Sequence, residues 1–360
     1  MTAGPIIRIE TSDFASAFGL VDAAIDRRSN TTAMNCVRLR TIANHRLELF
    51  GASSAGQITT DVPMKIMQEG EFNVCVPAEK LAPLIASAAD HVKLSMAPNG
   101  RLQFESKRTR GSIPMLPGAV MPEAHSPGEP LAEFDSPGIG ALIESVAFVS
   151  DEKDIREYCQ GVWLESDGKN VHAVATNVLM MATNQLAIGV PQFGFMLTEK
   201  SSLLLAGFDP ERLIIMQDGV VAMRGDAKLH MKKALLKFPA WRKGMPELKN
   251  SITFSLAQLR EAISVTRFYD SKLGVVRFLN DGDGYQIAIK DGEHEVDFDL
   301  DNVEQSGDAP FEHAFKGEQL AKMLARLSGE TVTFFWDAIA PRGFLMQDGT
   351  WRGIVSRLTL

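Results

Sequence analysis

The pattern of apolar and polar positions recurs along the chain. A strand-like apolar run followed by an amphipathic helix spans residues 71–85 and again 310–324, with Phe72/Phe311 and Leu81/Leu320 identical. A looser copy occupies residues 192–205, midway between the two. Because internal repeats fix an architecture, the pattern predicts three copies of one unit of about 120 residues.

A second element recurs at the same spacing. Segments 9–18, 134–143 and 254–263 carry apolar residues at i, i+5 and i+9, which is typical of a strand end leading into a helix. Ser12, Ser136 and Ser255 stand near the three helix starts as candidate N-caps. Between the two helices of each unit, alternating segments predict paired strands: 37–42, 161–165 and 275–279, then 46–50, 171–175 and 285–289.

The predicted fold class is therefore α+β, with three similar domains, each built from two helices packed on antiparallel sheets. Pro/Gly-rich stretches at 116–130 and 238–246 mark the linkers. The expected domains are 1–128, 129–250 and 251–360, in agreement with a 360-residue chain.

Composition indicates an ordinary soluble protein, with 45% hydrophobic and 23% charged residues. Arg8, Glu10 and Asp13 interrupt the N-terminal segment, so no signal peptide is expected, and no stretch has the length of a membrane span. The three cysteines are far apart, which predicts free buried thiols in a reducing compartment. The expected location is the cytoplasm, without a membrane partner.

Charge is segregated along the chain. A net charge of −8 argues against a nucleic-acid binder on average, but residues 224–243 hold seven bases and one acid, and residues 291–308 hold eight acids and no Lys or Arg. This partition indicates two faces of opposite sign, of which the basic one could neutralise phosphates. Two solvated surfaces without a partner are an equally good interpretation.

Signatures of catalysis are poor. The chain has no Walker loop, H-E-x-x-H or G-x-S-x-G, and Gly138-Ile-Gly140 is better explained as a helix start. Glu295, Asp297 and Asp299 alternate with apolar residues, which predicts a strand with one acidic face rather than a metal site. No catalytic residue, metal or cofactor is expected, and an enzyme is the less favoured class.

Several segments resemble one family in order along the whole chain. They are 112–117, 151–164, 171–177, 237–246 and 354–360. They are similar to the bacterial sliding clamp, the beta subunit of DNA polymerase III. The resemblance implies a head-to-tail homodimer that closes six domains into a ring around duplex DNA. It also implies a role in replication and repair, near the nucleoid, as a processivity factor. The implied partners are DNA polymerase subunits, the clamp loader and repair proteins, bound through short linear motifs.

The resemblance also implies functional residues. The DNA-facing positions are Arg28, Lys153, Arg156 and Lys200. The dimer interface is expected around Arg108, Arg110, Ile113 and Phe268, although a core position is the alternative for Ile113.

A peptide-binding groove between domains two and three is the other implied surface. Its matching positions are Thr176, Val178, Leu179, Met180, Met181, Pro239, Lys243, Gly244, Ile339, Pro341, Ile354, Val355, Ser356 and Leu358. Apolar walls with methionines suit aliphatic and aromatic peptide anchors, but an apolar run after a strand is otherwise core. The family's Asp-Gly-His-Arg-Leu is replaced here by Asn177-Val-Leu-Met-Met181, and its Met-Pro-Met tail by Ser356-Arg-Leu358. A greasier groove of different shape is expected.

Two alternatives stay open. One is a specialised clamp paralogue, for repair or from a mobile element, with restricted partners. The other, from a different class, is an enzyme on a three-repeat α+β scaffold with an unrecognised site.

Overall fold

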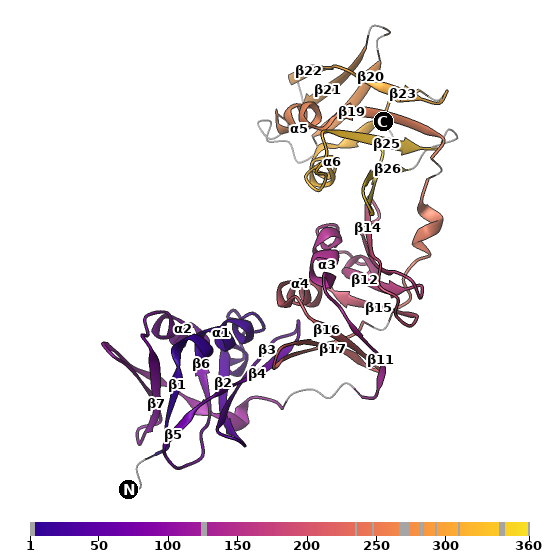
Figure 1. Ribbon diagram of the computed structural model, residues 1–360. Helices are drawn as coiled ribbons and strands as arrows, with labels where there is room; N and C mark the ends of the chain where they lie inside the picture. Colours follow the sequence, from indigo (N-terminus) through magenta and orange to yellow (C-terminus); the bar gives the residue numbers. More distant parts are fainter. Residues whose placement is uncertain are drawn as a thin grey trace. The chain divides into compact units, whose positions relative to one another are not determined.

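The computed structural model describes residues 4–123, 128–234, 236–246, 248–265, 274–280, 282, 284–291, 294–308, 310–337 and 343–358. Its elements follow one order three times: strand, helix, strands, helix, strands (Figure 1). The α+β class with three similar repeats is confirmed. All strand pairs in its four sheets are antiparallel.

The first repeat begins with a strand that leads directly into a helix. Its elements are β1 (Ile6–Glu10), α1 (Thr11–Asp22), β2 (Cys36–Ile42), β3 (Arg46–Ala52), β4 (Gln57–Pro63), β5 (Lys65–Gln68), β6 (Asn73–Pro77), α2 (Ala78–Ala86), β7 (His91–Ala97), β8 (Arg101–Ser106) and β9 (Thr109–Pro114). Short β10 (Leu116–Pro117) opens the linker to the second repeat.

The second repeat has the same order. Its elements are β11 (Pro130–Asp135), α3 (Ile139–Ala147), β12 (Gly161–Ser166), β13 (Val171–Thr176), β14 (Met180–Leu186), β15 (Phe193–Thr198), α4 (Glu199–Phe208), β16 (Arg212–Met216), β17 (Gly219–Arg224) and β18 (Ala227–Lys232). A 3-10 turn, η4 (Trp241–Gly244), lies in the linker that follows.

The third repeat closes the chain. Its elements are β19 (Asn250–Ser255), α5 (Leu256–Val265), β20 (Val275–Asn280), β21 (Tyr285–Asp291), β22 (His294–Leu300), β23 (Glu304–Ser306), β24 (Ala314–Lys316), α6 (Gly317–Leu324), β25 (Thr331–Trp336), β26 (Gly343–Asp348) and β27 (Trp351–Ser356). The strands and helices predicted from the three aligned segments are therefore confirmed.

The helices bury the apolar stripe that predicted them. In α1 the buried residues Phe14, Phe18 and Val21 follow helical spacing. Gly51 of β3 allows this close packing, because a Cβ there would lie 2.7 Å from Val21 Cγ1. In the third repeat, seven aromatic residues form a continuous core: Phe254, Phe278, Phe311, Phe315, Phe334, Trp336 and Phe344.

The proposed serine N-caps have different outcomes. The Ser255 hydroxyl accepts a 3.4 Å bond from Gln258 N and precedes α5, as predicted. For Ser12 the prediction is wrong, because α1 already begins at Thr11, whose backbone N–H donates to Asp90 O. The Ser136 hydroxyl donates instead to Pro210 O at 3.2 Å.

Two of the sheets are shared between repeats. β4 of the first repeat pairs with β18 of the second, and β14 of the second pairs with β27 of the third. The chain consequently separates into two compact units, Met1–Ala141 with Lys200–Ala234, and Leu142–Glu199 with Leu235–Leu360. The middle repeat contributes to both units, so compactness does not follow the repeats. The boundaries expected from the linkers stay a prediction.

The thiols and the acidic strand agree with the sequence-based expectations. Cys36, Cys75 and Cys159 are free and buried, and burial raises the pKa of each, that of Cys36 to about 11. In β22, Asp297 and Asp299 are exposed. Among the described residues, no group of three or more His, Cys, Asp or Glu could hold a metal ion. In the same ranges, no helix combines the length and the apolar character that crossing a membrane requires.

Candidate functional site

Arg28 and Lys153 occupy equivalent places in the first two repeats. The buried pairs Phe14/Ile139, Phe18/Ile143 and Val21/Val146 align α1 with α3 and, carried forward, align Arg28 with Lys153. Each cation follows an aspartate by two residues and donates its backbone N–H to that aspartate's Oδ1 at 3.0 Å, Asp26 or Asp151. Both side chains are exposed, each in the loop that follows the first helix of its repeat.

Arg156 lies in the same loop as Lys153 but has a carboxylate partner. Its Nε and Nη2 donate to the two oxygens of Asp154 at 2.8 and 2.7 Å. Hydrogen bonds from Arg156 lower the pKa of Asp154 to about 2, so the carboxylate remains charged throughout the neutral range. Arg156 therefore presents less net positive charge than Lys153. Ile155 between them is 94% exposed.

Lys200 is brought together with Arg28. It lies in the first turn of α4, and both side chains line one hollow of about 670 Å³ in the first compact unit. Lys153 and Arg156 belong to the second unit. Two of the four expected DNA-facing residues thus share a surface feature.

The β13–β14 turn holds the middle of the expected peptide groove. Asn177 Oδ1 accepts from Met180 N at 2.8 Å, and Thr176 Oγ1 accepts from Val178 N at 3.0 Å. Val178 has a φ of 73°, a left-handed conformation that is strained for a β-branched residue. Val178 is 46% exposed and Leu179 41%, so the turn presents two apolar side chains to solvent.

β27 meets this turn directly. Met180 pairs with Val355 and Met181 with Ile354, and Ser356 N donates to Leu179 O at 2.8 Å. Beyond the end of β27, Leu358 N donates to Ala314 O of β24 at 2.7 Å.

The groove positions divide into core and surface. Met180, Ile354 and Val355 are at most 7% exposed, so they are core residues, which was the alternative interpretation. Thr176, Met181, Ser356 and Leu358 are half-buried. Ile339 and Pro341 lie outside the described residues. The exposed face is therefore formed by Val178 and Leu179.

Pro239 and Lys243 lie apart from this turn and line a hollow of about 310 Å³ in the second compact unit. The exposed Gly244 follows them in the chain. Its other walls include Trp163, Phe238 and Trp241, and the Trp163 and Phe238 rings stack at 5.3 Å.

Glu165 organises this hollow and is missing from the sequence-based expectations. It accepts from Trp163 Nε1 at 2.7 Å, from Trp241 Nε1 at 3.2 Å and from Arg242 Nη1. Burial alone raises the pKa of Glu165, but these hydrogen bonds outweigh it and the pKa lies below its usual value. The sequence does contain a signal for Glu165, which is the alternation of buried and less buried residues along β12. It puts Trp163 and Glu165 on the face opposite buried Val162 and Leu164.

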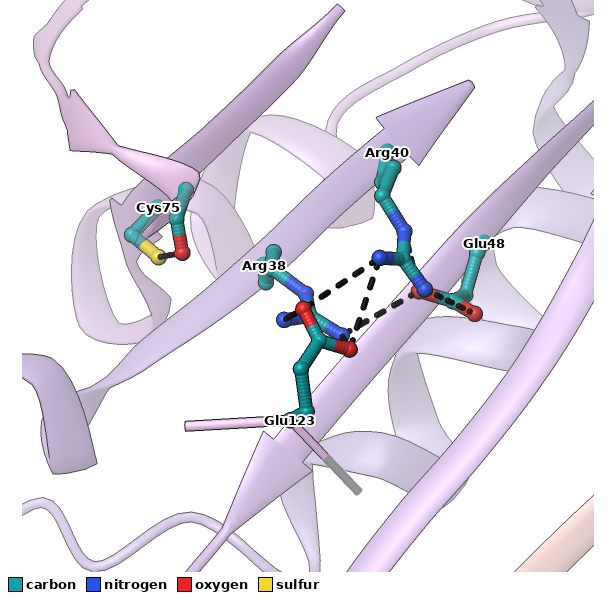
Figure 2. A network of polar contacts seen from close by, with 6 residues as sticks. Arg38, Arg40, Glu48, Cys75 and Glu123 are labelled. Carbon is teal, nitrogen blue, oxygen red and sulfur yellow. Dashed lines mark hydrogen bonds and ion pairs between the residues drawn. The ribbon is translucent and has the colours of Figure 1, made fainter. Parts of the chain in front are cut away.

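A counterpart lies on the first linker with the charges reversed. Figure 2 shows Arg38 and Arg40 of β2 around Glu48 and Glu123. Arg38 is 2% exposed, and its Nη1 donates to Glu123 Oε1 at 3.1 Å.

The buried pairs Val37/Val162 and Leu39/Leu164 align β2 with β12, so Arg40 corresponds to Glu165. The arginines of β2 bind a glutamate of the first linker, whereas the glutamate of β12 binds an arginine of the second linker.

The expected interface residues have three outcomes. Arg108 and Arg110 are exposed, in the β8–β9 turn and in β9. Ile113 is 3% exposed and pairs with Leu102, so in the single chain it is a core residue. Phe268 lies outside the described residues.

Known proteins that are similar to this chain include beta sliding clamps. No family model matches the chain. The Beta sliding clamp of Vibrio cholerae is 26% identical over 298 residues, which cover 78% of this chain and 80% of that protein. The Beta sliding clamp of Pseudomonas aeruginosa is 25% identical over 333 residues, 88% of each chain. The chain is a divergent relative of the beta sliding clamps.

Solved structures agree in fold over nearly the whole length. The DNA polymerase III subunit beta of P. aeruginosa matches with a TM-score of 0.87 and 21% identity, covering 99% of this chain and 100% of that one. The beta subunit of Thermotoga maritima gives a TM-score of 0.88 at 16% identity, with the same coverage. A further P. aeruginosa sliding clamp, at a TM-score of 0.85, is bound to griselimycin. The clamp fold therefore spans all three repeats.

The Glu165 cluster yields a pH-dependent prediction. Replacing Glu165 by Gln removes the charge that Arg242 and the two indoles stabilise, and we expect it to lower the free energy of unfolding by about 1–2 kcal/mol at pH 7. Because the folded-state pKa is depressed, this stabilisation is complete above the unfolded pKa of about 4.3 and is lost as the pH falls through the folded value. Urea unfolding at pH 7 and pH 3 tests it.

The exposed residue Glu144 of α3 provides the matched control, Glu144→Gln, which should leave stability unchanged at both pH values. If Glu165→Gln lowers the free energy of unfolding by as much at pH 3 as at pH 7, the stabilisation does not come from the charge of Glu165.

Proposed function

We propose that the protein is a DNA sliding clamp, a processivity factor that encircles duplex DNA and tethers DNA polymerases and other partners. The observation that carries the proposal is the strand pairing between successive repeats, together with the whole-chain match to sliding clamps. The same junction occurs twice within the chain, and among the described residues each half of it also occurs once without the other, as the terminal strand of a sheet.

The unpaired halves are β9 and β22. In both junctions the last strand of one repeat pairs with a strand of the repeat before it, namely the third strand between that repeat's two helices. The pairs are β18 with β4 and β27 with β14. The corresponding strands are β9 in the first repeat and β22 in the third, and each is the terminal strand of its sheet. Pairing β9 of one copy with β22 of another, twice, closes six repeats into a ring.

The two junctions also supply a register. Each last strand follows a two-residue turn, and its second residue is a cation: Arg110 in β9, Lys228 in β18 and Arg352 in β27. In the junctions, Lys228 lies opposite Thr59 and Arg352 opposite Thr183. The position facing the cation is thus the same in both.

In the third repeat this facing position is an acid. The equivalence follows from the pairing of the second and third strands that connect the helices in each repeat. The corresponding pairs are Phe50–Thr59, Val174–Thr183 and Ala288–Asp297. If the ring interface uses the same register, we infer that Arg110 of one copy lies opposite Asp297 of the other and Arg108 opposite Asp299. Opposite charges on facing strands favour this pairing.

DNA contact is proposed for Arg28, Lys153, Arg156 and Lys200. Surface cations that neutralise phosphates give sequence-independent contact, and a closed ring is retained without tight binding. A net charge of −8 is compatible with this, because only the surface that meets phosphates has to be positive. As a DNA-bound accessory protein without catalysis, it would work in the cytoplasm at the nucleoid.

Partner binding is proposed at the β13–β14 turn and the end of β27. Val178 and Leu179 offer exposed aliphatic surface to peptide anchors of polymerase subunits, the clamp loader or repair proteins. The missing glycine, histidine and arginine of the family's turn favour a restricted set of partners, as in a specialised paralogue.

Charge reversal tests the ring interface. Arg110→Glu places like charges opposite each other, costing about 1 kcal/mol at each of two interfaces, and should raise the dimer dissociation constant by about tenfold or more. Combining it with Asp297→Arg should restore the dimer. Analytical ultracentrifugation of the full chain measures both, and Lys169→Glu in an exposed turn is the control. A double variant as weak as the single one contradicts this register.

Topological retention tests the function itself. Arg110→Cys with Asp297→Cys, joined by a short bismaleimide in the presence of nicked circular DNA, should give a protein–DNA link that survives denaturant. Restriction cleavage of the circle should release it, because the linkage is mechanical. A variant with only one of the two substitutions should give no such link, because the three native cysteines are buried. Complexes that persist after linearisation, or none on circles, contradict encirclement.

Griselimycin, bound by the P. aeruginosa clamp, serves as a probe of the partner surface. We expect this chain to bind it and Leu179→Asp to weaken binding by tenfold or more, because a carboxylate replaces exposed apolar contact area. Isothermal titration calorimetry measures the affinity. Leu248→Asp, at another exposed leucine, is the matched control. Equal binding by the Leu179 variant places the partner surface elsewhere.

A further inference from the structure

A hollow of the first compact unit lies where the first and second repeats join. The end of α1, the β3–β4 turn and one side of α4 form its walls. Its volume of about 670 Å³ falls within the range of small-molecule sites. It is lined by Ala23, Asp26, Arg28, Ser53, Ser54, Ala55, Lys200, Leu203, Leu204 and Gly207.

The second junction fills the corresponding space. There the Arg326 guanidinium lies 4.5 Å above the Phe148 ring. The alignment of α1 with α3 makes Ala23 the counterpart of Phe148. Helix α4 aligns with α6 through the buried pairs Leu204/Met323, Leu205/Leu324 and Phe208/Leu327.

By this alignment Gly207 is the counterpart of Arg326. A Cβ on Gly207 would meet no atom within 4 Å. The hollow therefore exists because the two smallest side chains replace a stacked pair.

The lining has two chemical halves. Leu203, which is 50% exposed, and Leu204 form an apolar floor. Arg28 and Lys200 place two cations at the same hollow, and Ser53 and Ser54 add hydroxyls. Asp26 is held by its bond from Arg28 N and offers its second oxygen as an acceptor. A flat heterocycle joined to an anionic group matches this division.

We propose that the hollow binds one unstacked nucleotide, with its base on Leu203 and Leu204 and its phosphate on Arg28 and Lys200. An apolar surface accepts the face of a base, and cations at the edge accept the phosphate. Asp26 accepts a hydrogen bond from an exocyclic amino group. The nucleotide chemistry is independent of the ring, and only its origin in DNA rests on the proposed function.

The test uses the full chain with two probes, deoxyadenosine monophosphate and a duplex with a single-stranded tail carrying 2-aminopurine. Equilibrium dialysis should show saturable binding of the mononucleotide, with deoxyadenosine or phosphate alone binding at least tenfold more weakly. Ala23→Phe, which restores the ring of the second junction, should abolish binding, and Arg28→Ala should weaken it tenfold or more.

Matched controls are Ala15→Phe, at an exposed position of α1, and Arg27→Ala, whose side chain pairs with Asp22. Both should bind the mononucleotide like the unchanged protein. Undiminished binding by Ala23→Phe, or no saturable binding by the unchanged protein, overturns the proposal.

The tailed duplex distinguishes the source. If a nucleotide of DNA is the ligand, 2-aminopurine fluorescence should change with the unchanged protein and not with Ala23→Phe. Mononucleotide binding without that change identifies a free nucleotide as the ligand. Topological retention on circles is measured separately, so failure of the hollow leaves the ring intact, and failure of the ring leaves mononucleotide binding standing.

Discussion

Pairing of strands between repeats is the interaction on which the rest of the structure depends. Each repeat contributes strands to a sheet that it shares with a neighbouring repeat, where β4 pairs with β18 and β14 pairs with β27. Unpaired backbone donors and acceptors at a sheet edge are costly to bury, so each junction commits two repeats to one hydrogen-bonded sheet. The middle repeat is consequently divided between the two compact units. The relation between repeats is thus set by backbone hydrogen bonds as well as by side-chain packing.

The linkers secure these junctions through side chains of opposite polarity. Arg38 and Arg40 hold Glu123 in the first linker, and Glu165 holds Arg242 in the second. Because the charged partners are exchanged, a linker placed on the wrong sheet would bring like charges together. Each linker therefore recognises its own sheet, although the two sheets have the same architecture.

The sequence predicted the order of elements well because spacing alone determines it. Apolar positions at helical and strand periods located β1–α1, β6–α2 and their copies, and the charge alternation of 295–301 correctly indicated a strand. Details that depend on neighbours were less accessible. Ser12 resembled an N-cap, but Thr11 is already helical.

In the candidate sites, too, the features that depend on neighbouring residues were not accessible from the sequence. A run such as Val178–Met181 does not reveal from its letters which residues turn outward, nor that Val178 has a left-handed backbone. The hollow beside Ala23 and Gly207 becomes recognisable only when the second junction shows what fills that space.

The charges on the terminal strands have a consequence for a chain that has not yet found its partner. An exposed sheet edge can pair with any other edge, including an identical one. Two β22 strands would bring the carboxylates Asp297 and Asp299 of both copies to one edge, and two β9 strands would bring together the arginines at and before their starts, Arg108 and Arg110. Both self-pairings are repulsive, whereas the unlike edges attract. In the proposed ring, the charges of these two strands would therefore favour pairing of unlike edges and disfavour head-to-head contacts between like ones.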